Sequence, residues 1–164
     1  MTRLHARNLD SVSRVPPADW DALFPGSDPF CRHAFLAALE RHGCVGGNSG
    51  WIPQHLILQD GDRLVAAAPL YLKEHSYGEF VFDFAWARAS QELGRPYYPK
   101  LLCAIPFTPV AGPRLGAVDE TARRQLAEHM SALPERTSCS SLHALFLDDA
   151  AHTALNSTGF LERN

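Results

Sequence analysis

The chain has 164 residues, of which 46% are hydrophobic and 20% charged, and its formal net charge is −3. A chain of this length can bury a sizeable core, and we expect residues 1–164 to form one domain. No run of basic residues occurs, which excludes an electrostatic surface for nucleic acid. No apolar stretch reaches the roughly 20 residues of a membrane-spanning helix, and the N-terminus lacks the apolar core of a signal peptide. We therefore expect a cytoplasmic protein without a transmembrane segment.

The cysteines and histidines do not indicate a metal centre. No CxxC, HxxxH or HExxH pattern occurs, and the cysteine spacing fits no zinc site. Free, buried thiols are expected at Cys31, Cys44, Cys103 and Cys139. A disulfide is the less favoured alternative.

The first part of the chain predicts one strand and two helices. Residues 4–12 predict a short strand, and Pro16-Pro17 opens a short helix that Pro25-Gly26 ends. Asp28-Pro29 predicts the start of the second helix, because Asp can cap free amides and Pro is tolerated in the first turn. That helix ends near Gly43, and a glycine-rich loop follows.

The middle of the chain predicts a hairpin followed by an inserted helix. Residues 55–58 predict a strand, and Asp60-Gly61 is a strong turn signal. Residues 64–73 read as one largely apolar strand, in which Pro69 predicts a bulge or an edge because it removes a ladder hydrogen bond. Residues 85–92 predict a helix.

The last part of the chain alternates strands and helices. The sequence predicts a strand over 100–105, a helix over 118–133, a strand over 142–147, and a helix from Asp148 to near Gly159. The fold class is therefore α/β, with a mixed central β-sheet and helices on both faces. Residues 160–163 predict the start of one more strand. Because an exposed strand edge invites pairing, we expect a second copy of the chain to cover this edge or apolar surface.

The element order is similar to the beginning of the acetyltransferase (GNAT) fold, with one helical insertion. The motifs HSYGEFVFDFAWA, YYPKL and PFTPVAGPRL, preceded by DPFCRHAFLAALE and GWIPQHL, resemble the FemAB-like peptidoglycan biosynthesis/recognition family. The resemblance extends from Asp28 to Phe160. Members of that family usually have two acetyltransferase-like halves in tandem, and this chain resembles the N-terminal half. The resemblance therefore implies an incomplete GNAT fold.

The same resemblance implies a bacterial N-acyltransferase, or its substrate-binding half, acting on an amine of a peptidoglycan precursor or related acceptor. The alternative is a non-catalytic recognition or scaffold module that needs a second GNAT-like domain, a second chain or a homo-oligomer. Acyl transfer to an amine needs a base, an oxyanion donor and an acid for the leaving group.

Residues 70–116 combine rigid aromatics with titratable groups, as a ligand pocket does. Glu79 and Asp83 are candidate catalytic carboxylates. In an extended segment they share one face, while Phe80, Phe82 and Phe84 share the other. Against such an aromatic wall both carboxylates would have raised pKa values, as a base or an amine-binding pair needs. The alternative is that both lie at a solvated edge.

Tyr97 is a candidate acid for a leaving thiolate, and core packing is about equally favoured. The candidate substrate-binding residues lie nearby, and for each a solvated turn, a packing role or a plain surface charge is the alternative. They are His75, Tyr77, Tyr98 and Lys100.

The loop before the helix over 118–133 corresponds to the acetyltransferase loop whose amides hold the pyrophosphate of coenzyme A. Its candidate cofactor-binding residues are Gly112, Arg114 and Gly116. Pro109 and Pro113 remove amides, and two acidic residues follow at the helix start. We therefore expect acyl-CoA to bind weakly, chiefly through an exposed Arg114.

Overall fold

The computed structural model describes residues 4–163, and these form a mixed α/β fold with two four-stranded sheets. The first sheet contains, in spatial order, β1 (His5–Leu9), β3 (His55–Asp60), β4 (Arg63–Ala68) and β7 (Gly116–Ala117). The second contains β2 (Trp51–Pro53), β5 (Leu70–Lys73), β6 (Lys100–Cys103) and β8 (Leu142–Ala144). Neighbouring strands are antiparallel except β6 and β8, which are parallel. The α/β class is confirmed.

The single central sheet expected from the sequence is wrong, and Pro69 is the reason. β4 ends at Ala68 and β5 begins at Leu70, so the apolar run 64–73 passes from one sheet into the other. Proline has no N–H to donate, and one ladder therefore cannot continue through it. The two sheets separate at this point.

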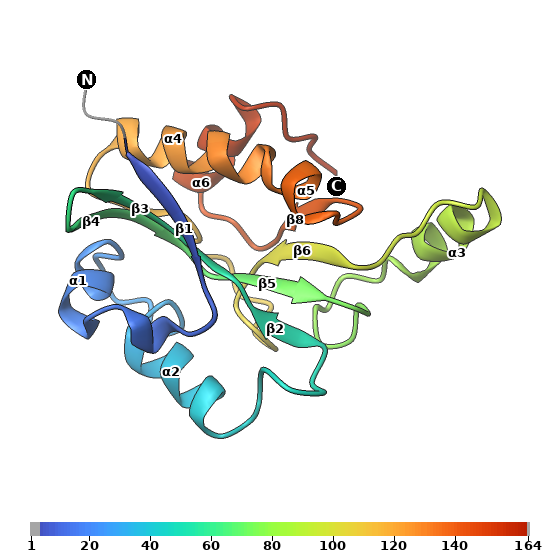
Figure 1. Cartoon of the computed structure of the whole chain (residues 1–164), viewed down its shortest axis with the longest axis horizontal. Coiled ribbons are helices and arrows are strands. Elements are labelled where there is room, and N and C mark those ends of the chain that lie inside the picture. The colour runs from blue at the N-terminus through green and yellow to red at the C-terminus, as the bar shows by residue number, and fades with distance from the viewer. Residues whose placement is uncertain (1–3, 164) are drawn as a thin grey trace.

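Helices cover both faces of the sheets, as predicted (Figure 1). One face carries α4 (Glu120–Ser131), α5 (Leu133–Thr137) and α6 (Asp149–Asn156). The other carries α1 (Pro17–Ala22), α2 (His33–Arg41) and a 3-10 helix, η1 (Val12–Arg14). Asp119 and Asp148 begin α4 and α6, because each carboxylate accepts a hydrogen bond from a first-turn amide, at 2.8 Å and 2.9 Å.

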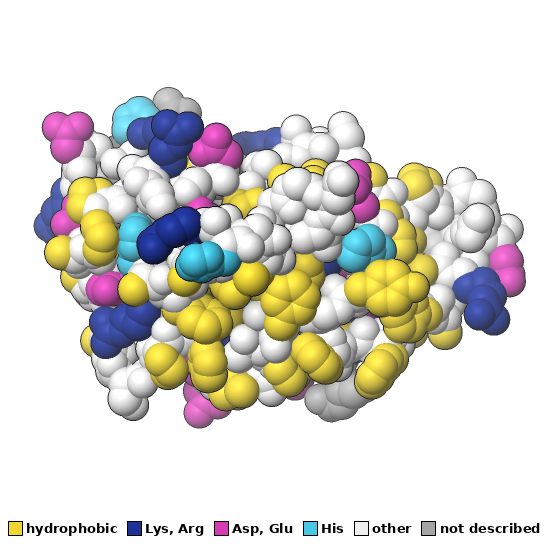
Figure 2. Space-filling model, turned by 90° about the horizontal axis from the view of Figure 1, so that it is seen from below, with side chains coloured by type: hydrophobic (Ala, Val, Ile, Leu, Met, Phe, Trp, Pro, Cys, Tyr) yellow, Lys and Arg dark blue, Asp and Glu magenta, His cyan; other side chains and the backbone are white. Residues whose placement is uncertain are grey.

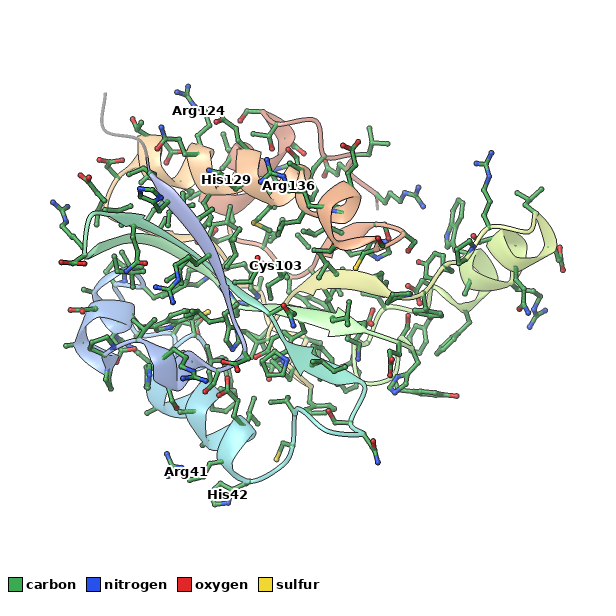
Figure 3. All side chains as sticks on the ribbon, viewed as in Figure 1. Arg41, His42, Cys103, Arg124, His129 and Arg136 are labelled. Carbon is green, nitrogen blue, oxygen red and sulfur yellow. The ribbon has the colours of Figure 1, made fainter. Side chains whose placement is uncertain are left out.

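Each helical layer packs on its own apolar core. One core joins α4 and α6 to the sheets through Leu58, Leu126 and Met130, and the other is built around Trp20 and Leu36. Figure 3 shows Cys103 in the interior between the layers, where its thiol is free and buried. Cys31 and Cys139 are also free and buried, as predicted, whereas the burial expected of Cys44 is wrong, because this free thiol is exposed in the loop after α2.

A long excursion, residues 74–99, connects β5 to β6, and we call it the arm. It contains α3 (Phe84–Glu92), close to the predicted helix. No residue of α3 is buried, and Figure 1 shows the helix projecting from the body of the protein. The arm leaves the second sheet and returns to it on neighbouring strands.

Three further details differ from the sequence prediction. Asp28 does not begin α2, because its carboxylate accepts from the Phe30 amide at 2.7 Å in a separate turn and the helix starts at His33. The short strands β2 and β7 were not predicted. Residues 160–163 form no strand, so the expected open edge at that position is absent.

Candidate functional site

A buried polar cluster fastens the base of the arm to the second sheet. We call it the Lys100 cluster, and its members are Lys73, Ser76, Glu79, Asp83, Tyr97, Tyr98 and Lys100. The Lys100 side chain is fully buried at the start of β6. Its Nζ donates to Glu79 Oε2 at 2.8 Å, to Asp83 Oδ2 at 2.6 Å and to Ser76 Oγ at 3.0 Å. The ammonium thereby uses all three of its donors.

Two tyrosines complete the hydrogen bonding around Lys100. The Tyr97 hydroxyl donates to Asp83 Oδ2 at 2.7 Å, and the Tyr98 hydroxyl lies 2.7 Å from Ser76 Oγ. Both residues lie in the returning part of the arm, shortly before β6, whereas Ser76 and Asp83 belong to its outgoing part. The hydrogen bonds therefore close the arm on itself at its base.

Lys73 is a second buried cation, and sequence reasoning missed it. It pairs with Lys100 in the register of β5 and β6, which would set two like charges side by side. Glu79 compensates this repulsion, since its two oxygens lie 3.9 Å from Lys73 Nζ and 2.8 Å from Lys100 Nζ. Lys73 also lies over the Trp51 ring at 3.8 Å. The available signal was a lysine at the end of one apolar strand, β5, and another at the start of the next, β6.

Two lysines and two carboxylates balance the charge of the cluster, but their pKa values are shifted from the ordinary values in different directions. Burial raises the pKa of Glu79 despite the nearby ammonium groups. Burial also acts to raise the pKa of Asp83, but hydrogen bonds from Lys100 and Tyr97 outweigh it, and the pKa is lowered. The expectation that both would be raised is therefore wrong for Asp83. Burial lowers the pKa of Lys73 to about 8.

The expected aromatic wall against the carboxylates is also wrong. Glu79 and Asp83 point inward and are 3% and 5% exposed, whereas the alternating aromatics point outward. Phe80 reaches this position with a φ of 59°, an uncommon backbone conformation for a bulky residue. The carboxylates contact cations rather than aromatic rings, although they do share one face of the segment and the phenylalanines the other, as predicted.

The outward aromatics form a second feature, which we call the arm's aromatic surface. Its members are at least 44% exposed, and they are Tyr77, Phe80, Phe82, Phe84 and Trp86. Figure 2 shows hydrophobic side chains gathered over one face of the molecule, from its centre toward the arm. Apolar side chains clustered at a surface are a common feature of interaction sites, which makes this surface a candidate for one.

The structure brings together five of the seven catalytic and substrate-binding candidates. Glu79, Asp83, Tyr97, Tyr98 and Lys100 all belong to the Lys100 cluster. The side chains of His75 and Tyr77 lie outside it, although the Tyr77 carbonyl accepts a hydrogen bond from Lys73 Nζ at 3.2 Å.

The His75 ring packs against Tyr77, with ring centroids 5.0 Å apart, and over Gly50, where a Cβ would lie 2.0 Å from the His75 Nε2. Tyr77 is 68% exposed and belongs to the arm's aromatic surface.

The three cofactor-binding candidates do not form an open phosphate loop. Arg114 is 1% exposed, donates to the Val110 carbonyl and lies 3.7 Å from Cys31 Sγ. The expected exposed cationic contact is therefore wrong. Gly116 pairs with β4 within β7, and Gly112 donates to the Phe146 carbonyl at 3.0 Å.

Burial raises the pKa of Cys31 to about 12, although the neighbouring Arg114 guanidinium acts to lower it, so this thiol stays protonated at neutral pH. The first-turn amide of Ala122 in α4 is already taken by Asp119.

The chain is therefore an α/β domain in which a buried, ion-balanced cluster lies at the base of an arm with exposed aromatic side chains. Comparison with known families matches residues 11–164 to the FemAB-like family, described as peptidoglycan biosynthesis/recognition, and the chain belongs to that family. Neither the curated proteins nor the solved structures searched gave a match. Within residues 4–163, no helix has the length and apolarity to cross a membrane.

Proposed function

We propose that this chain recognises the acceptor substrate, an amine-bearing peptidoglycan precursor, as the substrate-binding half of an N-acyltransferase. Family membership supplies the peptidoglycan context. The observation that carries the proposal is the arm, which exposes five aromatic side chains while its base is held by buried ion pairs. Rigid aromatic rings can pack against the apolar faces of sugar rings with little loss of conformational entropy on binding.

The Lys100 cluster supports a positioning role. Glu79 and Asp83 are already neutralised by the lysines, so neither is free to hold a substrate ammonium group as the cluster stands. Glu79 Oε1 and Asp83 Oδ1 nevertheless lack hydrogen-bond partners although both are buried. Such atoms can each accept one more donor if the arm opens at its base.

The transfer step itself is assigned to a second acetyltransferase-like half, in the same or another polypeptide. Buried Arg114 and the capped start of α4 support only weak binding of an acyl-CoA donor here. A non-catalytic recognition module with a cytoplasmic location is the second candidate. The arm's aromatic surface favours this candidate too, because a module that only recognises its substrate needs no site for an acyl donor.

Calorimetric titration tests this proposal with a soluble UDP-linked muramoyl pentapeptide that carries a free side-chain amine. We expect saturable binding, and at least a tenfold loss of affinity in the double variant Phe82→Ala, Trp86→Ala. Val118→Ala is the matched control, because Val118 is 45% exposed but lies outside the arm. Binding that is equal in the double variant and the wild type would refute the arm as the recognition surface.

A further inference from the structure

The strand β8 is the free edge of the second sheet. It pairs with β6 on one side, and within residues 4–163 no strand pairs with its other side. Residues 141–148 are neither buried nor fully exposed, so solvent reaches this part of the chain. An open strand edge presents unpaired amides and carbonyls that can bind another extended chain.

Two residues of β8 direct their backbone groups to the open side. The Ser141 carbonyl accepts a hydrogen bond from a β6 amide at 2.9 Å, and the Leu145 amide donates to a β6 carbonyl at 3.0 Å. Because backbone groups alternate in direction along a strand, those of Leu142 and Ala144 point away from β6. In the described part of the chain, neither residue forms a hydrogen bond on that side.

The open edge begins at the base of the arm. The Ser140 amide donates to the Pro99 carbonyl at 2.9 Å, and the Ser140 hydroxyl donates to the Tyr97 carbonyl. The Tyr97 and His143 rings pack edge to face, with their centroids 6.0 Å apart. A ligand that contacts the base of the arm therefore lies beside β8.

The side chains of β8 are polar on one face and apolar on the other. Leu142 and Ala144 pack against the core that holds α4 and α6. Ser141 Oγ lies 3.1 Å from His143 Nε2 on the opposite face. Burial lowers the pKa of His143 to about 4, so its ring is neutral at neutral pH. These polar groups suit the amides of a peptide rather than a charged group.

An exposed cation lies between β8 and the arm. The Arg163 guanidinium is 4.5 Å from the centroid of the Trp86 ring, and its charge also acts to lower the pKa of His143. Its neighbour Glu162 does not neutralise it, because Glu162 faces His152 at 3.3 Å. A guanidinium in this position favours a ligand that carries a carboxylate.

We propose that the open edge of β8 binds the peptide part of the precursor as an added strand, with Arg163 beside a carboxylate of that peptide. The inference rests on the function proposed above and names what the second sheet contributes to it. Main-chain hydrogen bonds supply the affinity of an added strand, and the outward groups of Leu142 and Ala144 provide them. β8 has only three residues, so the edge fits a short peptide better than a partner sheet.

Residue-resolved amide exchange of ¹⁵N-labelled protein tests the added strand. In the free protein we expect fast exchange at Leu142 and Ala144 and slow exchange at Leu145, whose amide bonds to β6. The UDP-linked muramoyl pentapeptide at saturation should slow the first two amides about tenfold, the equivalent of one hydrogen bond, and leave Leu145 unchanged. No slowing, or equal slowing of all three amides, would overturn the proposal.

Calorimetry with two probes separates the peptide from the sugar, since UDP-N-acetylmuramic acid lacks the peptide. Ala144→Pro removes one outward amide and keeps the bonds to β6, because proline is tolerated on an edge strand where its nitrogen faces solvent. We expect this variant to bind the pentapeptide precursor about tenfold more weakly and UDP-N-acetylmuramic acid equally well. Equal losses for the two probes would contradict the added strand.

Arg163→Gln is the second variant, and it changes only a surface side chain. It should also weaken the pentapeptide precursor selectively, whereas Arg124→Gln, an exposed arginine of α4, should change neither affinity. Wild-type affinity in Arg163→Gln would remove the cation from the proposal's support and contradict its second clause.

The free pentapeptide at millimolar concentration distinguishes this proposal from the one on which it rests. Slowed exchange at Leu142 and Ala144 with the free peptide, but no binding of UDP-N-acetylmuramic acid, would refute the arm alone. Binding of the full precursor without that slowing would refute the β8 edge alone.

Discussion

Lys100 Nζ lies 2.6 Å from Asp83 Oδ2. This ion pair joins the start of β6, where the chain returns from the arm, to Asp83, the residue that precedes α3. The Asp83 side chain is 7% exposed and that of Lys100 is fully buried, so water screens this ion pair little. The arm is therefore held by charge at its base, while its tip contributes nothing to the core.

Replacing Lys100 by Met should lower the free energy of unfolding by about 3–5 kcal/mol, because two buried carboxylates lose their shared cation. Urea denaturation measures this change. Arg124→Met is the control, since its ion pair with Glu128 is exposed and 3.8 Å long. Its removal should cost less than about 1 kcal/mol. Similar stabilities for the two variants would show that the cluster does not hold the arm.

The buried Lys73 should make stability depend on pH. Its folded pKa of about 8 lies below the ordinary value of 10.5, so between these values the unfolded state binds more protons. The contribution of Lys73 to the free energy of unfolding should therefore rise with pH across this window, by about 1–3 kcal/mol.

The measurement is the difference between wild type and Lys73→Met in urea denaturation at pH 7.5 and at pH 9.5. We expect the wild type to gain stability relative to the variant at the higher pH. A difference that is constant or falls with pH would mean that burial does not depress the lysine pKa.

Substitution of Trp86 by Ala should leave stability nearly unchanged, within about 1 kcal/mol. The ring is 58% exposed, and the contact it makes with the Arg163 guanidinium, 4.5 Å from the ring centroid, is also at the surface. Trp51→Ala is the contrasting variant, because Trp51 is 1% exposed. We expect this substitution to lower the free energy of unfolding by about 3–5 kcal/mol. Thermal denaturation of both variants distinguishes a binding residue from a structural one.

Acetyl-CoA should bind no tighter than the millimolar range. Asp119 already accepts from an amide of α4, and its charge repels phosphate, while Arg114 cannot reach solvent. An exposed cation would contribute only about 1 kcal/mol, far short of the roughly 8 kcal/mol of micromolar binding. Calorimetry provides the measurement, and micromolar affinity would reveal a donor site elsewhere in the chain.

The sequence predicted the α/β class and the position of α3, and it singled out five of the seven residues that meet in the Lys100 cluster but not Lys73 or Ser76, because apolar periodicity and aromatic density are local signals. It did not predict the separation of the sheets at Pro69. A proline in an apolar run indicates a break in the ladder, but whether the chain bulges or changes sheets depends on the packing of both layers.

The surroundings of individual charged residues could not be predicted from local sequence patterns either. Lys100 and Arg114 read as surface cations, yet both are buried, since their partners come from distant parts of the chain. Lys100 meets carboxylates of the arm, and Arg114 lies beside Cys31 from the segment before α2. Residues 160–163 do not form the predicted strand, because Phe160 instead packs against the core next to α6.

Hydrogen–deuterium exchange with and without the UDP-linked muramoyl pentapeptide tests the central claim, recognition by the arm, most directly. We expect the precursor to slow exchange in peptides covering residues 77–88, with no comparable change in peptides from α4. The slowing should be absent in the Phe82→Ala, Trp86→Ala variant, which remains folded. Protection confined to other parts of the chain, or protection of the arm that persists in the double variant, would contradict the account.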